Sequence, residues 1–143
     1  MGPSTSAGTA KSERNRARPV LLTLRAIASA HAIAIFGQPV FAGVLLSGDY
    51  DMLHVHAVGA DVVYYLGLAQ LAAALVLWAR RGPRWPSAAA ALIVLGETGQ
   101  YFAGLLGALG VHFPLGVALI ALSTVSLVAL WRPSALGAPE VAR

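Results

Sequence analysis

The sequence contains no cysteine, and only 11% of its residues are charged. Without cysteine, disulfides, thiolate metal sites and cysteine nucleophiles are excluded. A soluble domain carries about a quarter charged residues, whereas 57% of this chain is apolar and its mean hydropathy is +0.70. The composition therefore predicts an integral membrane protein whose main partner is the lipid bilayer.

Lysine is nearly absent too, since Lys11 is the single lysine beside nine arginines. This bias, in a background of Ala, Gly and Leu, is typical of GC-rich bacterial genomes, so we expect a bacterial plasma-membrane protein. The net charge is +4, but the basic residues form no patch that would indicate a nucleic-acid partner. They flank the apolar segments: Lys11, Arg14, Arg16, Arg18, Arg25, then Arg80, Arg81, Arg84, then Arg132 and Arg143.

Four apolar segments follow a polar, basic start, at about residues 20–46, 53–79, 87–109 and 113–131. A membrane span needs about 20 residues. We expect an all-α, integral membrane four-helix bundle with up-down-up-down topology over residues 19–132. The ends flanked by basic residues should be cytoplasmic, so both termini are predicted there, as a disordered basic tail (1–18) and a short tail (133–143).

The first and third segments resemble each other: "GQPVFAGVLLSG" (37–48) and "GQYFAGLLGALG" (99–110). Each is followed by a histidine at the start of the next segment, in "HAVGA" (56–60) and "HFPLG" (112–116). The chain therefore reads as two pseudo-repeated hairpins, although chance similarity in an Ala-, Gly- and Leu-rich sequence is the alternative.

Each predicted hairpin supplies one histidine and one glutamine to the same layer. In an up-down-up-down bundle the second and fourth helices are diagonal partners, which brings His56 and His112 face to face. Gln38 and Gln100 lie at a matching depth on the other diagonal. Small residues on the His56 face, Gly59 and Ala60 among them, leave room for a large flat ligand or simply allow close helix packing.

The stretch "DMLHVHAVGAD" (51–61) holds a second histidine two residues before His56. Two residues correspond to about 200° of helix rotation, so His54 and His56 cannot both face inward. We expect His56 to point into the bundle and His54 to lie at the rim. A Zn or Cu site formed by Asp51, His54 and His56 is a weaker alternative.

This order of elements resembles one four-helix half of the haem A synthase family: a His at the start of the second helix, a Gln-bearing third helix and a His at the start of the fourth. It is also similar to small bacterial four-helix membrane proteins with the same His/Gln pattern. The resemblance covers about residues 20–131 and implies a haem, b-type by preference, with His56 and His112 on the iron. The family motif has a carboxylate three residues before its first His and an Arg directly after it, where this chain has Leu53 and Ala57. The resemblance therefore extends to the ligands and not to oxidation chemistry.

Three further polar residues fall inside apolar segments: His31, Asp61 and Glu97. Ionisable groups within a membrane are costly and are functional candidates by default. His31 and Glu97 have similar depths on diagonal helices and could pair. The pair would either serve a proton or quinol site below the haem or simply fix the helix register.

Together these features predict a bis-His, cytochrome b-like protein that transfers electrons or handles haem, with a respiratory-chain or quinone partner. The alternative is a non-enzymatic membrane bundle that acts without haem as an accessory subunit or small-molecule module. The sequence leaves open whether the protein is an enzyme.

Overall fold

The computed structural model describes residues 4–133, and their side chains from residue 17 onward. Four helices cover almost all of this range: α1 (Ser4–Leu46), α2 (Met52–Ala79), α3 (Trp85–Leu105) and α4 (Leu109–Trp131). The described residues form no strand. The prediction of an all-α four-helix bundle is confirmed.

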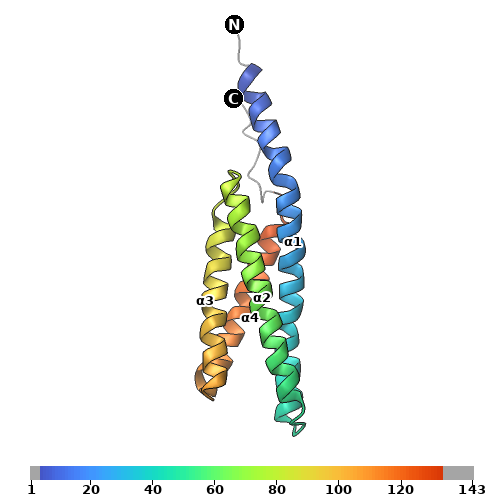
Figure 1. The fold of residues 1–143 in the computed structure, drawn as a ribbon, viewed down its shortest axis with the longest axis vertical. Coiled ribbons are helices and arrows are strands. Elements are labelled where there is room, and N and C mark those ends of the chain that lie inside the picture. Colours follow the sequence, from blue (N-terminus) through green and yellow to red (C-terminus); the bar gives the residue numbers. More distant parts are fainter. Residues whose placement is uncertain (1–3, 134–143) are drawn as a thin grey trace.

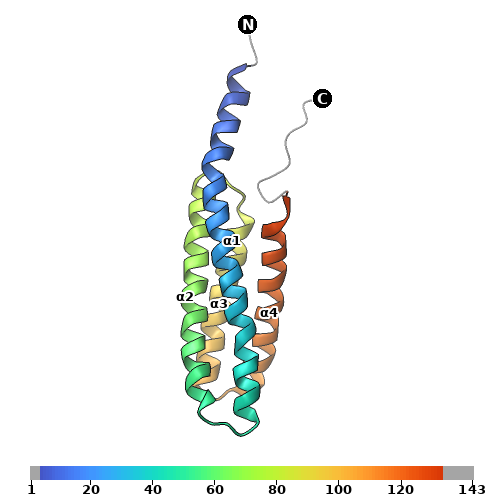
Figure 2. The same cartoon turned by 90° about the vertical axis from the view of Figure 1, so that its right-hand side faces the viewer.

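The helices run alternately up and down, so that the start of α1 and the end of α4 lie at one end of the bundle (Figures 1 and 2). Each helix packs against its neighbours in sequence, and α4 packs back against α1. The diagonal pairs are therefore α1 with α3 and α2 with α4, as predicted. Each helix contains a stretch long and apolar enough to cross a membrane, beginning at Ala17 in α1, and the chain is a multi-pass membrane protein.

The helix boundaries differ from the predicted ones mainly at three places: the start of α1, the end of α3, and the start of α4, which is Leu109 instead of residue 113. The sequence predicts disorder over residues 1–18, but the structure continues α1 back to Ser4. Most residues of this stretch are compatible with a helix. The rest of the two predicted tails, residues 1–3 and 134–143, lies outside the described residues. The topological side on which the tails lie stays a prediction.

The third helix ends at Leu105 instead of continuing to residue 109. Gly107 takes a left-handed conformation with φ of 65°. The amides of Gly107 and Ala108 bond back to the carbonyls of Gly104 and Ala103 at 3.1 and 2.9 Å. This is the Schellman pattern, which ends a helix because glycine adopts the left-handed turn without steric cost.

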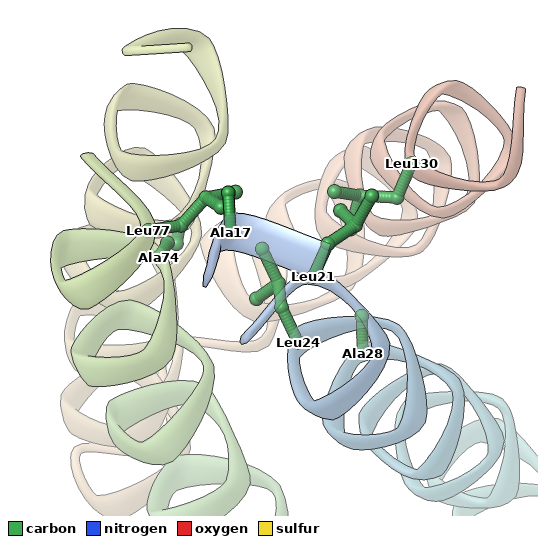
Figure 3. Close-up of a cluster of buried hydrophobic side chains, with 8 residues drawn as sticks. Ala17, Leu21, Leu24, Ala28, Ala74, Leu77 and Leu130 are labelled. Atoms are coloured by element: carbon green, nitrogen blue, oxygen red, sulfur yellow. The ribbon is translucent and has the colours of Figure 1, made fainter. Parts of the chain in front are cut away.

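A hydrophobic cluster fills the half of the bundle that contains the 80–84 turn, and we call it the packed half. It is built from small and branched apolar side chains of all four helices: Ala17, Leu21, Leu24, Ala28, Ala74, Leu77, Ala90 and Leu130. Figure 3 shows the α1 side chains lying between those of α2 and α4. Leu24, Leu77 and Leu130 are almost completely buried, so this half is a solid core.

Arg25 ties α1 to the end of α4 beside this core. Its Nε donates to the Leu130 carbonyl at 2.8 Å, and its Nη2 donates to the Arg132 carbonyl at 3.3 Å. The guanidinium also lies 5.1 Å from the centre of the Trp131 ring. A cation that satisfies the last carbonyls of a helix stabilises its C-terminus. Arg25 therefore stabilises the end of α4 and links it to α1.

Candidate cofactor-binding cavity

The opposite half of the bundle, which contains the 47–51 and 106–108 turns, holds a cavity of about 450 Å³ and is called here the cavity half. Small-molecule and cofactor pockets measure about 300–1,000 Å³. All four helices contribute to the wall, which includes the predicted site residues Gln38, His56, Glu97, Gln100 and His112.

The cavity is open at its sides. Leu46, Leu105 and Val117 belong to its wall, yet they are 69%, 69% and 68% exposed. These residues lie on α1, α3 and α4, at the loop end or on the outward face of each helix. A lipid-soluble ligand could therefore reach the cavity from the surrounding bilayer.

His56 and His112 meet inside this cavity. Their ring centres are 6.1 Å apart and their planes are inclined by 73°. The two residues come from the diagonal helices α2 and α4, which agrees with the prediction that they face each other. His54, in contrast, is exposed and is not part of the cavity wall, as its position two residues from His56 predicts.

The separation of the rings suits two ligands of one metal ion. Two imidazoles on opposite sides of a metal have ring centres about 6 Å apart, because the metal–nitrogen bond is about 2 Å long and each ring centre lies about 1 Å beyond its nitrogen. Inclined ring planes are compatible with this arrangement, because each ring can rotate about its own metal–nitrogen bond. The ring separation is therefore compatible with His56 and His112 as two ligands of one metal ion.

The surroundings of His112 leave one ring nitrogen available. Its Nδ1 lies 3.1 Å from the backbone carbonyl of Gln100. A carbonyl only accepts hydrogen bonds, so Nδ1 carries the proton and Nε2 has its lone pair free. Ligating histidines are commonly oriented by such a bond from the other nitrogen. His56 has a buried Nδ1 without a hydrogen-bond partner among the described residues.

The two hairpins repeat one further contact in the wall. A side chain on Gly59 would overlap the Gln38 amide, and a Cβ on Gly116 would lie 3.0 Å from Nε2 of Gln100. In each hairpin the glutamine of the first helix therefore lies over a glycine just after the histidine of the second. The sequence repeat corresponds to a repeated geometry, with both glutamines in the cavity wall.

A buried polar layer closes the cavity toward the packed half. His31 Nε2 lies 2.6 Å from Oε1 of Glu97, and His31 Nδ1 lies 2.9 Å from Oε1 of Gln70. The predicted pairing of His31 with Glu97 across the α1–α3 diagonal is confirmed. Gln70 was missed as a partner, although it lies on the same face of α2 as His56 and its position could have suggested the contact.

Gly67 makes this layer possible. A side chain at Gly67 would overlap Oε2 of Glu97 and would lie 3.3 Å from Cε1 of His31. The absence of a side chain on α2 thus makes room for the pair formed by α1 and α3.

Asp61 does not take part in the cavity. It is exposed on α2, and its Oδ1 accepts a hydrogen bond of 3.1 Å from the Tyr101 hydroxyl of α3. Tyr101 itself lines the cavity, so Asp61 contacts a wall residue from outside.

A Zn or Cu site at Asp51, His54 and His56 finds no support. The described residues contain no group of three or more His, Cys, Asp or Glu side chains that could hold a metal ion. His54 and His56 point to different surroundings, because a helix separates residues two apart by more than half a turn.

The cavity wall carries no arginine or lysine among the described residues. Its polar groups are the two imidazoles, the two glutamine amides, two tyrosines and the Glu97 carboxyl group, and the rest of the wall is apolar or glycine. Such a wall would hold a ligand through burial and a few directed contacts.

The resemblance noted in the sequence rests on short motifs spread over four helices. The chain was compared as a whole with protein-family models, with curated proteins and with solved structures. No match was found in any of these three comparisons.

Proposed function

We propose that the cavity binds one haem, b-type by preference, and that His56 and His112 would hold its iron. The observation that carries the proposal is the approach of the two imidazoles to 6.1 Å from diagonal helices within a cavity of about 450 Å³. The Gln100 carbonyl orients the His112 ring. The resemblance to a four-helix half of the haem A synthase family supports the same ligands.

Several small residues in the wall support the binding of a flat group. Ala57, Ala60, Gly104 and Gly116 all border the cavity. Since the wall has no cation among the described residues, binding depends on axial ligation and apolar burial rather than on ion pairs with the ring substituents.

A bound haem supplies a one-electron ferric–ferrous couple. His56 and His112 together would occupy both axial positions, which favours electron transfer or haem handling over chemistry at an open iron site. Leu53 and Ala57, which stand where the family has a carboxylate and an Arg, argue in the same direction. The proposed partner is a respiratory-chain component or a quinone in a bacterial plasma membrane.

The test is the absorbance spectrum of the protein purified in mild detergent after expression with ample haem. The wild type should show a Soret band whose position changes on reduction. His56→Ala and His112→Ala should each lose or strongly alter the band, while His54→Ala, a histidine two residues away outside the cavity, should keep it.

A colourless wild type, or a Soret band unchanged in both cavity variants, would contradict haem ligation by these residues. A colourless protein that co-purifies in fixed ratio with a larger complex would instead support the accessory-subunit alternative.

A further inference from the structure

Three helices contribute buried polar side chains to the layer below the cavity, and α4 carries a further buried polar residue, Ser123. His31, Gln70, Glu97 and Ser123 come from α1, α2, α3 and α4 and are 1%, 5%, 5% and 6% exposed. Glu97 also lines the cavity, so this layer forms its floor. Ligation by His56 and His112 makes no use of these groups, and their burial in a membrane requires an explanation.

The hydrogen-bond pattern fixes how many protons the layer holds. The Gln70 amide oxygen only accepts, so His31 Nδ1 carries a proton. His31 Nε2 and Glu97 Oε1 form an ion-pair contact of 2.6 Å, and we assign one further proton to this contact. The pair is then neutral overall, and it has one acceptor left, because Oε2 of Glu97 has no hydrogen-bond partner among the described residues.

We propose that the His31–Glu97 pair is a proton-binding site that takes up one proton from water when one electron enters the metal centre held by His56 and His112. The inference rests on the proposed function. The electron comes from a one-electron reductant and reduces ferric to ferrous iron. The proton binds to the free carboxylate oxygen, so that His31 becomes fully cationic and Glu97 becomes neutral. The summed charge of the metal centre and the His31–Glu97 pair then stays constant.

Helix α3 connects the two sites. Gly104 lies against the His112 ring, with a distance of 3.1 Å from a Cβ at Gly104 to His112 Cε1. Glu97 lies seven residues earlier, which corresponds to about 10 Å of helix rise. Over that distance, in a medium with an effective dielectric constant near 20, one unit of charge changes proton affinity by about tenfold.

Few other charges act on the pair. Among the described residues, His31 and Glu97 are each other's only charged partners. Helix α2 contributes the uncharged Gln70, and the buried polar residues of α4, Ser123 and Ser126, are uncharged as well. The remaining titratable groups near the cavity are the two imidazoles above, the wall tyrosines and Asp61 on the exposed face of α2. Arg25 lies in the packed half, bonded to the end of α4. A pH response measured at the metal centre is assigned to the pair by its loss in a variant of Glu97, which leaves these other groups and the haem propionates in place.

The experiment is a spectroelectrochemical titration of the haem-loaded protein at several pH values, with dithionite and mediators. The wild-type midpoint potential should fall as pH rises through the titration of the pair, by about 59 mV in total, because a tenfold change in proton affinity corresponds to 59 mV for a one-electron couple. Glu97→Gln, which keeps the shape of the side chain, should flatten this slope while the Soret band remains. Asp61→Asn removes the other carboxylate of the four membrane-spanning stretches and should leave the slope unchanged.

His31→Gln is the second variant, in case Glu97→Gln does not fold, and it should flatten the slope as well. A wild-type slope retained in either variant would overturn the inference while leaving haem binding intact. A colourless wild type would overturn the proposed function instead. Infrared spectroscopy then decides whether the pair binds protons, because a protonated-carboxyl band that changes with pH and is lost in Glu97→Gln supports the site, and the absence of such a band overturns it.

Discussion

The packed half and the cavity half are made from similar residues and reach opposite outcomes. In the packed half, leucines from one helix fill the space beside alanines of its neighbours, and Leu24, Leu77 and Leu130 are almost completely buried. In the cavity half, the polar side chains of Gln38 and Gln100 lie over glycines, and the two hairpins diverge toward their turns (Figure 1). Small residues thus permit close packing or leave open space, depending on what the facing helix carries.

The layer that separates the halves should be the most sensitive part of the molecule. His31→Ala leaves the Glu97 carboxyl group buried without its partner, and breaking a buried ion pair in this way costs about 3–5 kcal/mol. We expect this reduction in the free energy of unfolding, measured by denaturation in detergent micelles. His31→Gln can still offer Glu97 an amide hydrogen bond and should cost less, whereas equal losses in the two variants would contradict a role for that contact.

Truncation should distinguish the two halves directly. Leu77→Ala removes a fully buried side chain of the packed half and should lower the free energy of unfolding by about 2–5 kcal/mol. Leu105→Ala removes a side chain of the cavity wall that is 69% exposed, and it should cost far less in the same denaturation assay. Similar losses at both positions would mean that the cavity half is packed as tightly as the other.

Replacing an alanine by a larger residue should affect stability in the packed half and haem binding in the cavity half. Ala74 has no exposed surface, so Ala74→Phe overfills the core and should cost about 1–3 kcal/mol or more. Ala60 borders the cavity, so Ala60→Phe should be accommodated with little loss of stability while it reduces the amount of haem bound. Thermal unfolding and the Soret-to-protein absorbance ratio measure the two effects, and unchanged haem content in Ala60→Phe would contradict binding in the cavity.

Two glycines at the α3–α4 turn should give the smallest effects, with opposite signs. Gly107→Ala places a side chain at φ of 65° and should destabilise the protein by about 1 kcal/mol. Gly110 lies in α4, and a Cβ at this position would meet no atom within 4 Å, so Gly110→Ala should stabilise the protein by up to about 1 kcal/mol. The measurement is the thermal unfolding temperature of each variant relative to the wild type. A loss of stability in Gly110→Ala would contradict the assigned helix start at Leu109.

Much of the site could be predicted from the sequence because the rise and the rotation per residue are fixed in a helix. Spacing alone separates His54 from His56, and equal depth on diagonal helices brings His56 to His112 and His31 to Glu97. The contact from Gln70 to His31 was not predicted, because it depends on how far α2 rotates about its axis. The position of Gly107 in the turn likewise required the backbone conformation, and so the end of α3 was misplaced by four residues.

The sequence by itself determined that the chain enters the membrane, that it forms four helices and which residues share a depth. These properties follow from hydropathy, segment length and the fixed rise of a helix. The tertiary structure alone decided which of the small-residue faces close and which enclose a cavity. That outcome depends on the facing side chains: alanine against leucine excludes space in the packed half, while glutamine against glycine and histidine against histidine border the space in which we propose that a haem binds.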